Sequence, residues 1–313
     1  MLAEALHKDN ERQGMDTNTR RVFESRLAGL WYPADSGQLA NAIDAYINVD
    51  DDAPLENVIA LVLPHAGYAY SGATAGAGMA QVAGRDYSRV VVLGATHRYA
   101  LPNTVSMPDA THYATPLGEV PLDTEFMAEI EKQAFATINP TVHSEEHSVQ
   151  IEIPLLQRAL KHFKLVPVIC GQLDPETVTR VGGVLRALID NQTLVVVSSD
   201  FTHYGERFGY TPFRDDVPGQ VERLDMGAVD LMKQKQARRF MAYIEDTGAT
   251  ICGHIPIAIL LTMLPQASRL HVLKYDTSGR ITGDYANTVS YLSAAVTGNW
   301  TSDLSARHSV PAS

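Results

Sequence analysis

The chain has 313 residues, 45% of them hydrophobic and 19% charged, and this balance excludes a disordered protein and predicts a globular one. Lys and Arg number 25 against 36 Asp and Glu, so the net charge of -11 repels phosphates, and we expect neither a nucleic-acid partner nor a membrane one. No run of 18 apolar residues is present, residues 1–21 are polar, and two cysteines are too few for a disulfide framework, so we expect a cytoplasmic protein.

Strands and helices are predicted to alternate along the chain. In chain order we expect a strand at 58–63, a helix at 73–83, a strand at 90–93, helices at 124–133 and 149–162, a strand at 165–169, a helix at 176–189 and a strand at 194–197. Helices at 221–235, 237–243 and 254–264 follow, and then strands at 271–275 and 288–292. The first four strands are rich in Val, Ile and Leu, which is typical of burial on both faces of a sheet. This pattern predicts an α/β protein with a mainly parallel sheet flanked by helices.

The two ends of the chain differ from its middle. Both are polar and lack an apolar period, and no low-complexity linker divides the residues between them. We therefore expect a single α/β domain at 23–297, a mobile N-terminal extension at 1–22 and a C-terminal tail at 298–313.

Three of the predicted strands end close to a histidine, and these are His65, His97 and His203. In open α/β sheets, ligands bind outside the carboxyl ends of the strands, where loops and helix N-termini converge. A glycine near each histidine leaves room for a close approach, namely Gly67, Gly94 and Gly205. A single histidine in such a place is more often structural, but three together predict one polar cleft that holds a metal ion.

Two further residues are expected at helix N-termini. His147 lies in the stretch 144–148, which resembles a cap of the helix at 149–162. The positive end of the helix dipole would lower the pKa of its imidazole and keep it neutral. Cys252 lies in a turn before the helix at 254–264, a position that favours the thiolate form. A lone cysteine is usually a small core residue, and this is what we expect for Cys170.

Short motifs along the chain resemble those of the Memo-like family. They are Pro64-His65-Ala66-Gly67-Tyr68, Gly94-Ala95-Thr96-His97, Glu146-His147-Ser148, Ser199-Asp200-Phe201-Thr202-His203-Tyr204-Gly205 and Thr250-Ile251-Cys252-Gly253. The resemblance runs from about Arg26 to Tyr291. Members of this family include proteins described as component B of an AmmeMemoRadiSam system, and their fold is similar to that of the class III extradiol non-haem iron dioxygenases.

The resemblance implies a set of site residues at matching positions. The metal ligands would be His65, His97 and Cys252, with His203, Asp200 and His147 close by. The extradiol dioxygenases carry a carboxylate where this family has a thiolate. Two histidines and a carboxylate leave open positions on Fe(II), whereas two nitrogens and a softer sulfur also suit copper or zinc. We expect one divalent ion, with iron as the first choice and copper or zinc as alternatives.

The first functional hypothesis is a mononuclear redox enzyme that is dioxygenase-like and acts on a small, aromatic or phenolic substrate. His203 would be the base, Asp200 would hold its ring in one tautomer, and His147 would stabilise charge that develops on oxygen. Tyr68, Tyr204 and Glu146 would line the substrate pocket.

Two other hypotheses use the same cleft. In the first, zinc activates a water for hydrolysis of an amide or ester, and His203 or Glu146 relays protons. In the second, the protein binds a peptide or partner without turnover, as an accessory of a radical-SAM or copper-handling system with AMMECR-like or radical-SAM partners. The surplus of titratable residues beyond the three ligands favours an enzyme.

Overall fold

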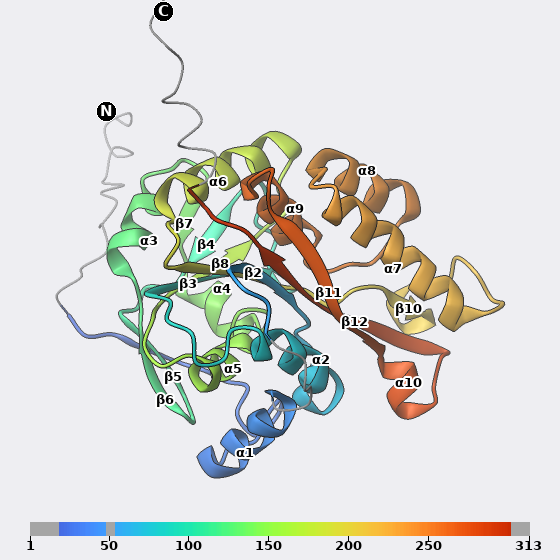
Figure 1. The fold of residues 1–313 in the computed structure, drawn as a ribbon, viewed down its shortest axis with the longest axis horizontal. Coiled ribbons are helices and arrows are strands. Elements are labelled where there is room, and N and C mark those ends of the chain that lie inside the picture. Colours follow the sequence, from blue (N-terminus) through green and yellow to red (C-terminus); the bar gives the residue numbers. More distant parts are fainter. Residues whose placement is uncertain (1–18, 48–53, 302–313) are drawn as a thin grey trace, which may run out of the picture.

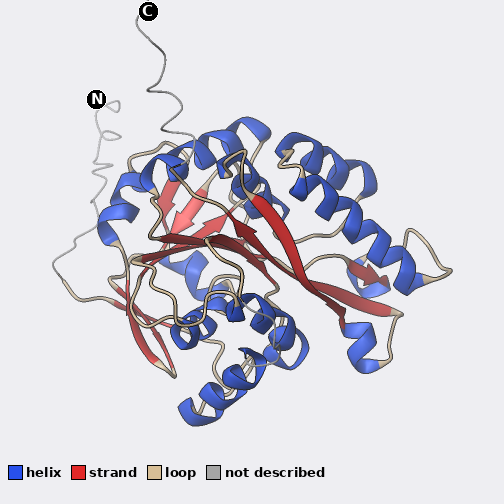
Figure 2. Ribbon diagram, viewed as in Figure 1, coloured by secondary structure: helices blue, strands red, loops and turns tan. Residues whose placement is uncertain are grey.

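The computed structural model describes residues 19–47 and 54–301. It forms a single α/β domain, as predicted, in which helices flank a central mixed sheet of nine strands and a small three-stranded sheet lies beside it (Figure 1; Figure 2). Most of the predicted N-terminal extension and C-terminal tail falls outside the described residues. Within the described residues, no helix combines the length and the apolar character that crossing a membrane requires.

The four strands predicted to be buried on both faces form the parallel centre of the sheet, which confirms that part of the prediction. They are β2 (Val58–Leu63), β3 (Arg89–Ala95), β8 (Lys164–Cys170) and β9 (Thr193–Ser198). Their order is β2–β9–β3–β8, and all their residues are buried except the first of β3 and of β8. Because β9 lies between β2 and β3, Ser198 is level with Leu63 on one side and with Gly94 on the other.

Antiparallel strands complete both edges of the sheet, so it is mixed. On one side, β12 (Asn287–Thr297) pairs with β2 and carries β11 (Arg269–Thr277) and β10 (His203–Gly205). On the other side, β4 (Val105–Met107) pairs antiparallel with β8 and parallel with β7 (Ala136–Ile138). The last two predicted strands are therefore the antiparallel neighbours β11 and β12.

The sequence prediction missed the helix α1 (Ser36–Ile47) and the shortest elements. The short ones are β1 (Val22–Glu24), β5 (His112–Thr115) and β6 (Gly118–Pro121) of the small sheet, β4, β7 and β10 of the large one, α4 (Pro140–Glu145), α10 (Ser278–Thr282) and the 3-10 helix at Glu206–Phe208. A strand of three or four residues contains too few positions for a period-2 pattern to be recognised.

Seven helices follow the predicted ones with shifted ends. They are α2 (Tyr68–Ala80), α3 (Thr124–Glu131), α5 (Glu152–Ala159), α6 (Pro175–Leu188), α7 (Val217–Lys233), α8 (Ala237–Thr247) and α9 (His254–Met263). In α6, the side chain of Asp174 accepts a hydrogen bond from the Thr177 N–H, and Pro175 occupies the first turn, as the sequence indicated. In Figure 1, α2 and α5 lie below the central strands, and α6 and α9 lie above them.

The folded domain extends beyond the predicted boundaries at both ends. Val22, placed in the extension, begins β1. Trp300, placed in the tail, is fully buried, and its indole N–H donates to the Thr193 carbonyl at 3.0 Å. A buried tryptophan adds a large apolar contact, so this part of the tail belongs to the core.

Candidate metal centre

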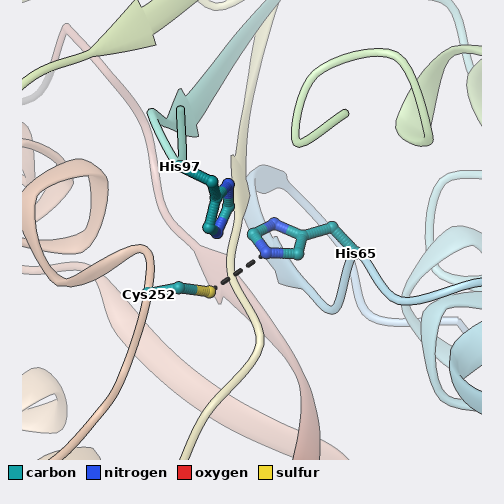
Figure 3. A group of neighbouring side chains, drawn as sticks. All are labelled: His65, His97 and Cys252. Atoms are coloured by element: carbon teal, nitrogen blue, oxygen red, sulfur yellow. Dashed lines mark hydrogen bonds between the residues drawn. The ribbon is translucent and has the colours of Figure 1, made fainter. Parts of the chain in front are cut away.

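Two strand ends and one helix-entry turn bring three donor side chains together. His65 lies two residues after β2, His97 two residues after β3, and Cys252 in the turn before α9. Figure 3 shows the two imidazoles and the thiol pointing toward one another from these segments. One donor atom from each, a ring nitrogen or the sulfur, lies within 4.8 Å of the others. The alignment of β2, β9 and β3 at Ser198 explains why His65 and His97 meet.

His65 is held from behind by the end of β9. Its side chain is buried, its Nδ1 lies 3.0 Å from Ser198 Oγ, and its Nε2 lies 3.0 Å from Cys252 Sγ. Ser198 Oγ donates its one proton to the Ser148 carbonyl, which can only accept, so it accepts from His65 Nδ1–H; it also lies 3.0 Å from the Glu152 carboxyl. The lone pair of Nε2 then faces the sulfur. Burial and the nearby histidines lower the pKa of His65, which keeps it neutral as a metal ligand requires.

Glu146 fixes His97 in the same way. The His97 backbone N–H donates to Glu146 Oε2 at 2.6 Å, and Nδ1 lies 2.8 Å from Oε1. Burial opposes ionisation of this carboxyl, but the hydrogen bonds and charges of His97 and His147 outweigh it and lower its pKa to about 2. The His97 Nε2 is thereby left free, and its side chain is 30% exposed, so the centre opens to solvent here.

The expected place of Glu146 in the substrate pocket is wrong. The residue is buried at 1% exposure, and its Oε1 also accepts from the backbone N–H groups of His147 and Ser148. With both oxygens engaged, the carboxylate lies behind His97 and supports it, and it is not available as a relay to a water molecule.

The turn that carries Cys252 is fixed by Ser199. The Gly253 N–H donates to Ser199 Oγ at 2.9 Å, and a Cβ at Gly253 would lie 2.3 Å from Ser199 Cβ, so only glycine fits. Burial raises the pKa of the Cys252 thiol, and the nearby Asp200 adds to this rise. In the protein alone, burial and Asp200 therefore oppose the thiolate that the helix N-terminus was expected to favour. A coordinated metal ion reverses this balance, since a ligating thiol is deprotonated.

His147 stacks on His97 rather than capping a helix. Ser144 and Glu145 belong to α4, and α5 begins only at Glu152. The His147 ring lies 4.5 Å from the His97 ring and 4.5 Å from the Trp31 ring, stacked on both. Burial and the charge of His97 lower the pKa of His147 to about 4, so it is neutral as expected, but the helix dipole is not the cause. Trp31 was not among the predicted site residues.

His203 lies on the other side of the cleft, at the start of β10. Its Nδ1 lies 3.0 Å from the Phe201 carbonyl and 3.2 Å from the Thr250 carbonyl, so this nitrogen carries the proton and Nε2 is the acceptor. Burial lowers its pKa. The ring is close enough for its charge to lower the pKa of His65.

Asp200 does not orient His203, contrary to the prediction. Its carboxylate accepts the His65 backbone N–H at 2.8 Å and is 4% exposed. Burial raises its pKa to about 7 despite hydrogen bonds from the His65 and Ala66 backbone. Asp200 therefore places the chain at His65, and two backbone carbonyls set the tautomer of His203 instead.

The two tyrosines predicted to shape the pocket are buried in the protein. Tyr68 is 3% exposed and donates to the Ile151 carbonyl at 2.9 Å, and Tyr204 is 5% exposed and donates to the Phe213 carbonyl at 2.6 Å. Their hydroxyls are thus engaged in the framework, and the expectation that they contact a substrate is wrong.

Buried polar residues behind the site were missed by the sequence analysis. Ser198 and Glu152 stand behind His65, and Asp225 of α7 accepts hydrogen bonds from Thr202, Tyr275 and Ser290. Burial raises the pKa of Asp225 to about 6, although these hydrogen bonds lower it. Their partners come from distant segments, so no local spacing marks them.

Comparisons with known proteins give one consistent result. A family model described as "Memo-like protein" matches residues 23–295. "Protein memo-1 homolog" of Caenorhabditis elegans is 30% identical and the match covers 86% of this chain and 81% of that protein. "Protein MEMO1" of Xenopus laevis is 30% identical over 87% of this chain and 96% of that protein, and the human protein of that name is 28% identical over 88% and 97%. An uncharacterized protein of Escherichia coli has a similar fold, with a TM-score of 0.51, 15% identity, and coverage of 77% of this chain and 100% of that one.

Proposed function

This chain belongs to the Memo-like protein family, and we propose that it binds one divalent metal ion through His65, His97 and Cys252. The observation that carries the proposal is the arrangement of their donor atoms. Each imidazole has its Nδ1 engaged by Ser198 or Glu146, so each presents Nε2. Metal-ligating histidines are oriented in this way by their second nitrogen.

The spacing of His65 and Cys252 fits a single ion. Metal–sulfur and metal–nitrogen bonds are about 2.3 and 2.1 Å long for zinc, so two such ligands of one ion lie at most about 4.4 Å apart. The 3.0 Å between His65 Nε2 and Cys252 Sγ is within that limit. Three protein ligands leave further positions open, as in catalytic sites rather than closed structural ones.

The activity we propose first is oxidation of a small, aromatic or phenolic substrate. Bound iron would supply redox chemistry with dioxygen. His203 is the base, because its Nδ1–H is held by carbonyls and its Nε2 can take the proton of a substrate hydroxyl. His147 is neutral, so it can stabilise developing negative charge only by donating a hydrogen bond from its ring N–H. Its stacking on His97 holds the ring in place.

Hydrolysis with zinc is the second candidate. The thiolate donor is compatible with it, since zinc is bound by both cysteine sulfur and histidine nitrogen. His203 alone would relay protons in this case, because the Glu146 carboxylate is fully engaged.

Metal content separates these proposals from a site that binds no ion. We expect protein purified without added metal, or loaded anaerobically with Fe(II), to hold one ion per chain by elemental analysis. His65→Ala and Cys252→Ala should weaken binding more than about 100-fold, beyond the loss typical of outer residues. His162→Ala, at an exposed surface histidine, is the matched control. Wild-type metal content in the two ligand variants would refute the proposal.

Oxygen uptake by the iron-loaded protein then tests the redox reaction. His203→Ala should keep the metal and lose turnover, because the ring is a base and not a ligand. If His203→Ala also loses the metal, the assignment of His203 as base is wrong. If iron and zinc forms alike turn nothing over, the protein is a binding or accessory protein.

A further inference from the structure

A cavity of about 690 Å³ adjoins the sulfur side of the candidate metal centre. Of the three proposed ligands, Cys252 lines this cavity, and most of its wall is apolar, with Leu173, Met241, Ile244 and Ile255. Ligand sites have this size and this mainly apolar lining with a few polar groups. Among the proposed ligands and the proposed base, Cys252 alone lines this cavity, so the metal centre itself does not account for it.

The cavity continues into a second one, of about 480 Å³, along α8. The two share Pro175, Arg238 and Met241, so they form one groove beside α8, which we call the α8 groove. Glu245, seven residues after Arg238, lines only the first cavity, together with Cys252, whereas Arg238 lines both. Seven residues are two helical turns, so Arg238 lies about 10 Å along α8 from Glu245.

The Arg238 end of the α8 groove is basic in an acidic protein. Four of the 25 Lys and Arg residues fall in positions 233–239, although the net charge is -11. Lys233 pairs with Asp230, Lys235 donates to the Gln266 and Ser268 carbonyls, and Arg239 donates to Gln236. The Arg238 guanidinium, in contrast, has no hydrogen bond or ion pair with any residue that the structure describes.

We propose that the α8 groove binds the substrate of the metal centre as an apolar molecule with a terminal carboxylate. The carboxylate pairs with Arg238, the apolar body lies along Met241 and Ile244, and the opposite end reaches Cys252. This inference rests on the proposed function, because it names the substrate class of that site.

Glu245 sets the direction in which the molecule lies. Its carboxylate would repel an anion at the Cys252 end, whereas Arg238 attracts one at the other end. The reacting end of the substrate is therefore its uncharged end, and acids too short to extend from Arg238 toward Cys252 are poor ligands.

The test uses sodium butanoate, hexanoate, octanoate and decanoate as probes, with octan-1-ol and octylammonium as uncharged and cationic counterparts. Binding to the purified protein, with and without zinc, is followed by NMR of methyl-labelled Met and Ile. We expect shifts at Met241 and Ile244, an affinity that rises at most about fourfold per added methylene, and weaker binding of both counterparts. If the acids bind equally well without zinc, the groove rather than the metal ion is their binding site.

Variants identify the contact. Arg238→Met should weaken octanoate about fivefold and remove its advantage over octan-1-ol, whereas Arg214→Met, at an exposed arginine outside the groove, should not. Ala242→Trp, at an exposed position on α8, should fill the groove and abolish binding. Unchanged octanoate binding in Arg238→Met or in Ala242→Trp would overturn the proposal.

A paramagnetic ion in the metal centre shows which end of the bound octanoate lies near Cys252. In cobalt-loaded protein, the terminal methyl of octanoate should relax faster than the methylene next to its carboxylate. Faster relaxation at the carboxylate end would mean that the acid binds the metal itself and would overturn the proposal. Cobalt that binds while no methyl group shifts would refute the groove alone, and methyl shifts without any metal binding would refute the metal centre alone.

Discussion

A single carboxylate, that of Glu146, connects the backbone and the ring of His97 to the loop before α5. Four N–H groups converge on it, from the His97 backbone and ring and from the backbone of His147 and Ser148. Hydrogen bonds to an ionised acceptor are about twice as strong as neutral ones. The bond from His97 Nδ1 to Glu146 leaves Nε2 as the nitrogen that His97 presents. The residue thus determines how well His97 can serve as a ligand.

Glu146→Gln should weaken metal binding about 10- to 100-fold while the fold is kept, because the amide accepts fewer of these hydrogen bonds and carries no charge. Titration with Zn²⁺ followed by calorimetry measures the change. Glu145→Gln is the matched control, since Glu145 is the neighbouring residue and accepts only the exposed Tyr99 hydroxyl. Equal affinities of the two variants would show that Glu146 does not support His97.

Packing between elements fixes the position of the sulfur. The turn into α9 lies against the end of β9, where Ser199 occupies the space next to Gly253. The site thus depends on contact between two elements that are 54 residues apart in the chain. A small displacement of this turn moves Cys252 away from His65.

Gly253→Ala should lower both stability and metal affinity, because its Cβ would come within 2.3 Å of Ser199 Cβ and the turn must shift. Such overpacking typically costs about 1–3 kcal/mol. Denaturant unfolding and zinc titration test the two effects. Gly183→Ala in α6 has open space around its Cβ and should be stabilising by about 0.5–1 kcal/mol with unchanged metal affinity. A Gly253→Ala protein as stable as wild type would contradict the tight packing.

At the scale of the whole molecule, Asp225 links α7 to both strands of the β11–β12 pair and to the loop that carries His203. Its fully buried carboxylate accepts from the Thr202 hydroxyl at 2.6 Å, Tyr275 at 2.7 Å and Ser290 at 2.5 Å. Burial raises its pKa from 3.8 to about 6, so ionisation is harder in the folded state than in the unfolded one.

The free energy of unfolding should therefore contain a contribution from Asp225 that falls as the pH rises. The native state binds the proton more tightly, so the stability is greatest below pH 4 and is lost between about pH 4 and 6, by about 3 kcal/mol in total. Asp225→Asn should remove this contribution from urea unfolding measured at several pH values. Asp230→Asn, at an exposed position on α7, should keep the wild-type dependence. A dependence that is the same in Asp225→Asn and wild type would show that Asp225 ionises freely.

Much of the fold was predictable because its central strands are long apolar runs. The stretches that became β2, β3, β8 and β9 were recognised, since burial on both faces requires such runs. The short strands at the edges were not recognised, because three or four residues take their structure from their neighbours.

The sequence by itself determined the α/β class and the positions of His65 and His97 after their strands. Only the tertiary structure decided what each polar side chain contacts. It assigned Glu146 to His97 and Asp200 to the His65 backbone, and it placed Tyr68 and Tyr204 in the framework. The physical reason is that apolar periodicity and turn chemistry act between near neighbours in the chain, whereas hydrogen bonds and desolvation depend on groups that only folding brings together.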